Sequence, residues 1–273
     1  MPQNLEIRVL FCYSPEVLLY TYPDIAMLIE DNKQTCQLIA NTLNRNLDRT
    51  KYNIKATYTD SVNVYKLQNQ WYRSNTCLTN RQLDNLTICT SSNAWYIKPM
   101  FGRLPRKILE LKSQYQASVV ILQVHICRKD NNSSLFIGCA AGIGITKPSE
   151  AVISIGRSTA VLNRPNYRFN ASMVVHELGH LMGCRHPKGM GAGCDNSGGN
   201  AHGHWFKDPL GTATFPYGTI MSYAERHILY YSNPNILKYP APYQNIACGV
   251  LGESEAYKTV NNNVQKLAGI FPP

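Results

Sequence analysis

Along the first two thirds of the chain, segments with the apolar pattern of β-strands alternate with segments that have the apolar spacing of α-helices. Residues 6–13 (EIRVLFCY) predict a buried strand that ends at Ser14-Pro15. Apolar residues then recur every three to four positions over residues 24–47, which predicts an amphipathic helix with one solvent-exposed face. The same patterns predict further strands over 53–65, 118–126, 137–145 and 151–155, and helices over 106–115 and 253–268.

Three of these segments carry more specific information. Residues 118–126 are almost continuously apolar, as in a central strand covered on both faces. Residues 137–145 (IGCAAGIGI) are small and glycine-rich, which predicts an edge strand that another part of the chain approaches closely. Asn170 is expected to cap a helix over 171–183. The residues that follow are rich in glycine and proline, which predicts mainly irregular loops.

The order of these elements predicts a mixed α/β (α+β) fold around a twisted sheet. We expect an N-terminal lobe over residues 1–183, which holds the sheet and the helix over 171–183. A loop-rich C-terminal lobe is expected over 184–273, ending in a helix, and the two lobes together form one domain.

The amino-acid composition indicates a globular protein and argues against a membrane-spanning one. The chain has 273 residues, of which 44% are hydrophobic and 16% charged, as in a globular protein. No apolar run approaches the ~18 residues that would cross a bilayer, so no membrane span is expected. The net charge of +10 favours acidic partners. Because the basic residues are scattered and no nucleic-acid motif occurs, no nucleic-acid partner is expected.

Nine cysteines occur without a CxxC pair, which argues against a cysteine zinc ribbon. Their number suits an oxidising compartment with some disulfides, and Cys184–Cys194 and Cys127–Cys139 are candidate pairs. The alternative is a set of buried free thiols in a cytosolic protein. The first residues lack a signal-peptide pattern, so an exported protein would either have its signal or propeptide outside this chain or use another route of export.

The strongest chemical signal is the string HExxHxxGxxH from His176 to His186. His176 and His180 are spaced to lie one helical turn apart on one face, where both can bind one ion. Gly183 allows the chain to leave the helix, so that His186 can become the third ligand. Three neutral imidazoles with an open position are typical of catalytic zinc, and Glu177 is placed to act as general base on the attacking water.

Chance is a poor explanation of this string. From the composition, its five specified residues are expected in about one in a hundred thousand chains of this length. The alternative is a metal-free amphipathic core helix whose histidines are satisfied by hydrogen bonds.

A second motif, Thr219-Ile220-Met221-Ser222-Tyr223, follows His186. With the histidine string, it resembles the signature of the metzincin zinc metallopeptidases. The opening strand and the IGCAAGIGI segment look most like the reprolysin-like (adamalysin-like) enzymes, in particular the bacterial peptidyl-Asp metalloendopeptidases. The resemblance implies a metzincin-type two-lobe catalytic domain, zinc on His176, His180 and His186, and Met221 beneath the metal.

Other residues near these motifs have two possible roles each. Tyr223 could contact the metal or pack beneath the site. The histidines His202, His204 and His227 could bind a second metal, and the alternative for His202-Gly203-His204 is a polar loop. Oxygen ligands for calcium could come from Asp195, Asn196 and Asp208. Arg226 and His227 could favour acidic substrate residues or form a solvated pair.

The resemblance implies a secreted, monomeric zinc endopeptidase that hydrolyses internal bonds of peptides or proteins, with a possible preference for acidic residues at the cut. One alternative is a secreted toxin or effector binding module that keeps the zinc site for recognition. Another is an HExxH aminopeptidase with a distant glutamate ligand.

Overall fold

A computed structural model describes residues 1–20, 22, 24–64, 104–125, 138–157, 169–189, 199–206, 217–222, 224, 226–237 and 246–270. The elements in the N-terminal part are β1 (Gln3–Tyr13), α1 (Pro15–Tyr20), α2 (Ile25–Asn46), β2 (Tyr52–Asn63), α5 (Leu104–Gln114), β3 (Val119–His125), β4 (Gly138–Ala140), η2 (Pro148–Glu150), β5 (Val152–Arg157) and α7 (Phe169–Leu181). They are followed by β6 (Trp205–Phe206), β7 (Tyr217–Gly218), β8 (Arg226–His227), β9 (Asn233–Leu237), β10 (Ala247–Cys248) and α8 (Ala256–Leu267).

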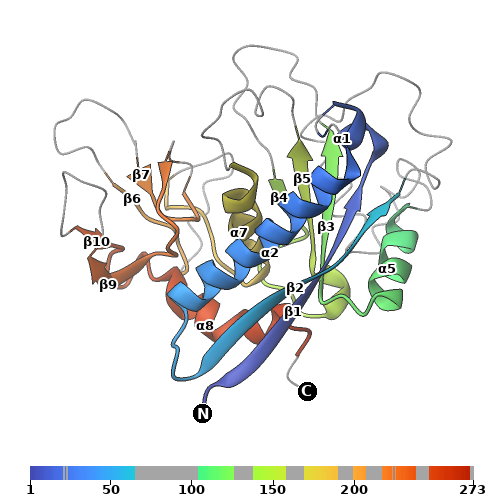
Figure 1. Cartoon of the computed structure of the whole chain (residues 1–273). Coiled ribbons are helices and arrows are strands. Elements are labelled where there is room, and N and C mark those ends of the chain that lie inside the picture. Colours follow the sequence, from blue (N-terminus) through green and yellow to red (C-terminus); the bar gives the residue numbers. More distant parts are fainter. Residues whose placement is uncertain are drawn as a thin grey trace.

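A five-stranded mixed sheet organises the N-terminal part, in the order β2-β1-β3-β5-β4. The first four strands are parallel, and β4 pairs antiparallel with β5 at one edge. β3 is therefore the central strand, which confirms the prediction from its continuous apolar run. Two small sheets, β6-β7-β8 and β9-β10, lie in the C-terminal part, and Figure 1 shows them to one side of the large sheet.

Successive side chains of β3 pack into different layers because strand side chains alternate between faces. Val119 and Ile121 join a buried cluster with residues of α2, α7 and α8, whereas Val120 and Leu122 join a second cluster with α5. The sheet is thus covered by helices on both faces, and Figure 1 shows α2 crossing the front of it. The predicted mixed α/β fold is confirmed.

α2 forms where the helical spacing predicts it. The side chain of Asp24 at the N-cap accepts a hydrogen bond from the Met27 amide (2.9 Å), which satisfies one of the free amides of the first turn. Buried residues Leu28, Cys36, Ile39 and Leu43 recur on one side of the helix and make that side the core face.

The structure adds one helix to the elements predicted from the sequence and differs from the predictions at two places. Pro15 begins the short helix α1, because proline fits the first position of a helix, where its missing amide is not needed. The strand expected over 137–145 is only three residues long. Helix α7 begins at Phe169, so Asn170 lies within the helix and is not its N-cap.

The C-terminal helix α8 belongs to the main core. Ala256, Val260, Val264 and Leu267 are fully buried in the same cluster as α2 and α7. The core therefore continues across the boundary at residue 183 that the sequence predicted between two lobes. Among the described residues, no helix has both the length and the apolarity to cross a membrane.

We predict that Leu43→Ala destabilises the protein by about 2–5 kcal/mol, because it leaves a cavity between α2 and the sheet. Leu43 is fully buried, whereas Leu251 is 78% exposed and provides a matched control. Urea unfolding would measure both variants. Equal losses for Leu43→Ala and Leu251→Ala would contradict the assignment of the core face of α2.

Candidate metal centre

Helix α7 places the first two histidines of the motif side by side. His176 and His180 are four positions apart, so both project from the same side of the helix. Their ring centroids lie 4.9 Å apart, and both residues are buried, with 5% and 8% of their surface exposed. Val174, Val175, Leu178 and Leu181 anchor the helix in the core and so hold the two rings in place.

The chain leaves α7 at Gly183, as the motif predicts. Gly183 has a φ of 101°, which glycine adopts without steric cost. Its amide donates to the His180 carbonyl (2.8 Å), and the Cys184 amide donates to the Gly179 carbonyl (2.8 Å). This pair of bonds is the Schellman pattern at a helix end. It turns the chain back beneath the helix.

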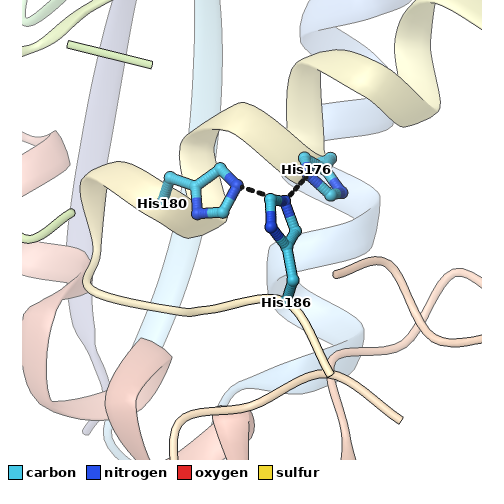
Figure 2. Close-up of side chains that lie close together, drawn as sticks. All are labelled: His176, His180 and His186. Carbon is cyan, nitrogen blue, oxygen red and sulfur yellow. Dashed lines mark hydrogen bonds between the residues drawn. The ribbon is translucent and has the colours of Figure 1, made fainter. Parts of the chain in front are cut away.

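This reversal brings His186 to the other two rings. Its Nε2 lies 3.1 Å from Nε2 of His176 and 3.0 Å from Nε2 of His180. Figure 2 shows the His186 ring rising from the segment beyond the helix toward the space between the other two. Among the described residues, this trio is the one group of at least three His, Cys, Asp or Glu side chains close enough to share an ion.

Hydrogen bonds on the far side of two rings determine which nitrogen faces inward. Nδ1 of His176 lies 2.7 Å from the Ile220 carbonyl oxygen, and Nδ1 of His180 lies 2.8 Å from the Cys184 carbonyl oxygen. Because a carbonyl can only accept, each Nδ1 carries the proton and each Nε2 presents a lone pair. Two lone pairs therefore converge on His186, whose Nε2 can supply at most one proton between them.

Burial keeps these imidazoles neutral. It is the main cause that lowers the pKa of His180 to about 4 and that of His186 to about 3. The pKa of His176 is lowered well below its usual value, first by burial and then by the neighbouring His180 and His186. Protonation cannot readily relieve the crowding of lone pairs, so a bound cation is the natural partner for them.

The donor set fits a zinc ion. Two nitrogens bound to zinc at ~2.05 Å with tetrahedral geometry lie about 3.3 Å apart. The distances to His186 Nε2 of 3.0 and 3.1 Å are close to that value. In two of the three neutral imidazoles, those of His176 and His180, the outer nitrogen donates to a backbone carbonyl, which is a common outer contact of histidines that bind zinc.

Comparison with known proteins agrees with this geometry. The sequence matches the family described as "Metallo-peptidase family M12B Reprolysin-like" over residues 53–187, a range that includes all three histidines. The chain belongs to the reprolysin-like metallopeptidases. No curated protein sequence matches it significantly. The narrower placement among bacterial peptidyl-Asp enzymes stays a prediction.

Solved structures share the fold of this reprolysin-like chain. One, titled "Structure of a chaperone-substrate complex", aligns with a TM-score of 0.58 and 17% identity. The alignment covers 97% of this chain but 35% of the other, so this chain spans about a third of that protein. At this identity the match supports the fold and says nothing about activity.

Glu177 belongs to helix α7, and its side chain lies against the edge strand β4. It is 3% exposed. A β-carbon added at Gly138 of β4 would come within 2.5 Å of Glu177 Oε1 and 2.9 Å of its Cγ. The close approach predicted for the glycine-rich segment 137–145 is confirmed, and Glu177 is the residue that approaches. The two remaining glycines of that segment lie in the loop beyond β4, where the Gly144 amide donates to the His180 carbonyl (2.8 Å).

The predicted methionine turn lies against α7 on the side of Gly179. Met221 is fully buried, and a β-carbon at Gly179 would clash with its sulfur and lie 2.9 Å from the Tyr231 ring. The Tyr231 hydroxyl donates to the Val175 carbonyl of the same helix (2.7 Å). The turn also supplies the Ile220 carbonyl that orients His176, a contact that the sequence did not reveal.

Three other histidines do not form a second metal cluster with described residues. His202 is fully buried, and its backbone forms an isolated bridge with Arg185. Its Nδ1 donates to the His186 carbonyl (2.8 Å). Nε2 of His227 lies 2.8 Å from the Ser222 carbonyl oxygen of the methionine turn, and the His204 ring packs edge-on against Phe206.

Cys184 is a buried free thiol whose sulfur lies 3.7 Å from the Ala256 carbonyl oxygen, so the suggested disulfide with Cys194 is not formed. Cys12 and Cys36 are also free, and burial raises the pKa of each to about 12. Several other residues singled out in the sequence lie outside the described part, namely Tyr223, Cys127, Cys194, Asp195, Asn196, Asp208 and the side chain of Arg226.

We predict that Gly179→Ala destabilises the metal-free protein by about 1–3 kcal/mol through overpacking against Met221 and Tyr231. Helix propensity alone predicts the opposite sign, a gain of about 1 kcal/mol. Gly142→Ala is the control, because a β-carbon there would meet nothing within 4 Å. Urea unfolding with a chelator present would decide, and a stabilised Gly179→Ala would show that Met221 does not pack against the helix.

The free energy of unfolding of the metal-free protein should fall as the pH drops below about 6.5. The unfolded chain takes up protons on its histidines there, whereas folded His180 and His186 remain neutral down to about pH 4 and 3. The stability present above pH 6.5 is therefore lost progressively through this window. His180→Gln should show a shallower loss in pH-dependent unfolding, and parallel curves for the two proteins would contradict the lowered pKa.

Proposed function

We propose that this chain is a zinc-dependent endopeptidase in which His176, His180 and His186 hold the metal and Glu177 is the general base. The proposal is carried by the position of His186 Nε2, which lies 3.1 Å from Nε2 of His176 and 3.0 Å from Nε2 of His180, with all three rings neutral. The metallopeptidase family supports peptide-bond hydrolysis as the reaction. It does not favour the alternative of a binding module that keeps the site for recognition alone.

Different residues of the site have different roles in the proposed hydrolysis. When bound, zinc would supply a Lewis acid to the attacking water and the scissile carbonyl. The neighbouring carboxylate of Glu177 accepts a proton from the water as it attacks and returns that proton to the leaving amine. Carbonyl partners on Nδ1 keep the His176 and His180 rings in the orientation that exposes Nε2.

The substrate is proposed to be an extended peptide that runs along β4. Within the described part of the chain, this strand pairs with β5 on one side and is the last strand of the sheet. An edge strand can accept a further strand through backbone hydrogen bonds, independently of most side chains. Because Gly138 of β4 also contacts Glu177, a peptide added there would pass close to the general base.

Three finer features of the proposal rest on the sequence alone. The protein is proposed to act outside the cell and as a monomer. A preference for acidic residues at the cut is proposed from Arg226, which follows the methionine turn, and from the net charge of +10.

Glu177→Gln should fold and retain zinc but lose peptidase activity by about 100- to 10,000-fold, because the amide cannot accept the proton. Cleavage of a protein substrate by the zinc-loaded variant would be measured beside its metal content. Glu110→Gln, on the opposite face of the sheet, is the matched control and should cleave like the unmodified protein.

A chelator should abolish cleavage by the unmodified protein, and added zinc should restore it. Two results would refute the proposal: chelator-resistant cleavage, or near-normal turnover in Glu177→Gln with full zinc content.

A further inference from the structure

The third histidine of the cluster is held differently from the other two. Helix α7 fixes the backbone of His176 and His180, whereas His186 lies in an irregular segment beyond the helix. A metal ligand must stay within a few tenths of an ångström of its position to bind well. Some other part of the chain must therefore fix His186.

A buried chain of hydrogen bonds reaches His186 from the C-terminal helix. Nδ1 of His202 donates to the His186 carbonyl oxygen (2.8 Å). The His202 carbonyl accepts from the Ser232 hydroxyl (2.5 Å), and the Ser232 oxygen accepts from the Ala256 amide at the start of α8 (2.9 Å). His202, Ser232 and Ala256 are all completely buried, so water cannot replace any of these partners.

Backbone pairing holds the same segments together. Arg185 and His202 form a parallel bridge, in which the Arg185 amide donates to the Ala201 carbonyl (2.9 Å) and the Gly203 amide donates to the Arg185 carbonyl (2.8 Å). On the other side, the Glu255 amide donates to the Asn200 carbonyl (2.6 Å). The segment that carries His202 thus lies between the third histidine and the first turn of α8.

We propose that His202 is a positioning residue, which couples the placement of His186 to the packing of α8 through Ser232. The inference rests on the proposed metal-binding function of the cluster. It makes the metal and the start of α8 thermodynamically linked. Whatever loosens the chain of hydrogen bonds weakens metal binding, and removing the metal loosens the Ala256 amide.

The imidazole suits this role because it fills a buried space and offers a donor on a short, rigid side chain. The geometry also identifies the replacement that should preserve the function. In asparagine, the side-chain amide nitrogen stands at the same number of bonds from the backbone as Nδ1 of histidine, so it can still donate to the His186 carbonyl. Leucine has similar bulk but no donor, and it would leave that carbonyl without its partner.

The test compares zinc affinity, measured by competition with a chelator and without any substrate. His202→Leu should weaken zinc binding by about 10- to 100-fold, the usual cost of losing an outer contact to a metal ligand. His202→Asn should recover most of the affinity. Thr35→Val, which removes a buried hydrogen bond to the Asp31 carbonyl within α2, is the control and should bind zinc like the unmodified protein.

Hydrogen exchange provides a second readout on the unmodified protein, in case His202→Leu does not fold. The Ala256 amide should exchange more slowly with zinc than without it, and Ser232→Ala should remove much of that difference. Equal zinc affinities of His202→Leu and His202→Asn would overturn the proposal, as would zinc-independent exchange at Ala256. Failure of the proposed function would look different, because the unmodified protein would then bind no zinc or cleave no peptide.

Discussion

The structure depends on one electrostatic constraint, which is that the Nε2 atoms of three imidazoles, at least two of them presenting lone pairs, meet in a space from which water is largely excluded. Two backbone carbonyls orient the His176 and His180 rings so that their Nε2 atoms point inward. Burial then makes protonation costly and holds the pKa of each ring below its usual value. Such an arrangement is poorly satisfied by hydrogen bonds alone and well satisfied by a divalent cation.

The rest of the fold can be understood as the support for that arrangement. The sheet and α2 provide a hydrophobic surface against which α7 packs. The glycine at 183 allows the chain to return beneath the helix. The methionine turn fills the space beside Gly179, where a β-carbon would clash with Met221. Helix α8 completes the same core, so residues that precede and follow the zinc motif in the sequence pack in one hydrophobic cluster. A substitution in the C-terminal part can therefore affect the histidine cluster without replacing one of the three histidines.

Much of this could be predicted from the sequence, because the signals are local. Helical spacing located α2 and the pair His176 and His180, and the glycine-rich segment at 137–145 correctly indicated a close approach. The parts that were missed depend on contacts between distant residues. Nothing near Ile220 indicates that its carbonyl binds His176, 44 positions away, and the short motif around His202 reads as a polar loop until Ser232 and Ala256 are placed beside it. The suggested Cys184–Cys194 disulfide failed for a related reason, since spacing alone cannot show that Cys184 is enclosed by α8.

The most direct test of the central claim is X-ray absorption at the zinc edge on the purified, zinc-loaded protein. The account predicts one zinc per chain, with three imidazole nitrogens at about 2.0–2.1 Å and a further light atom at the open position. A zinc ion bound through sulfur, or a protein that retains no stoichiometric zinc while correctly folded, would contradict it.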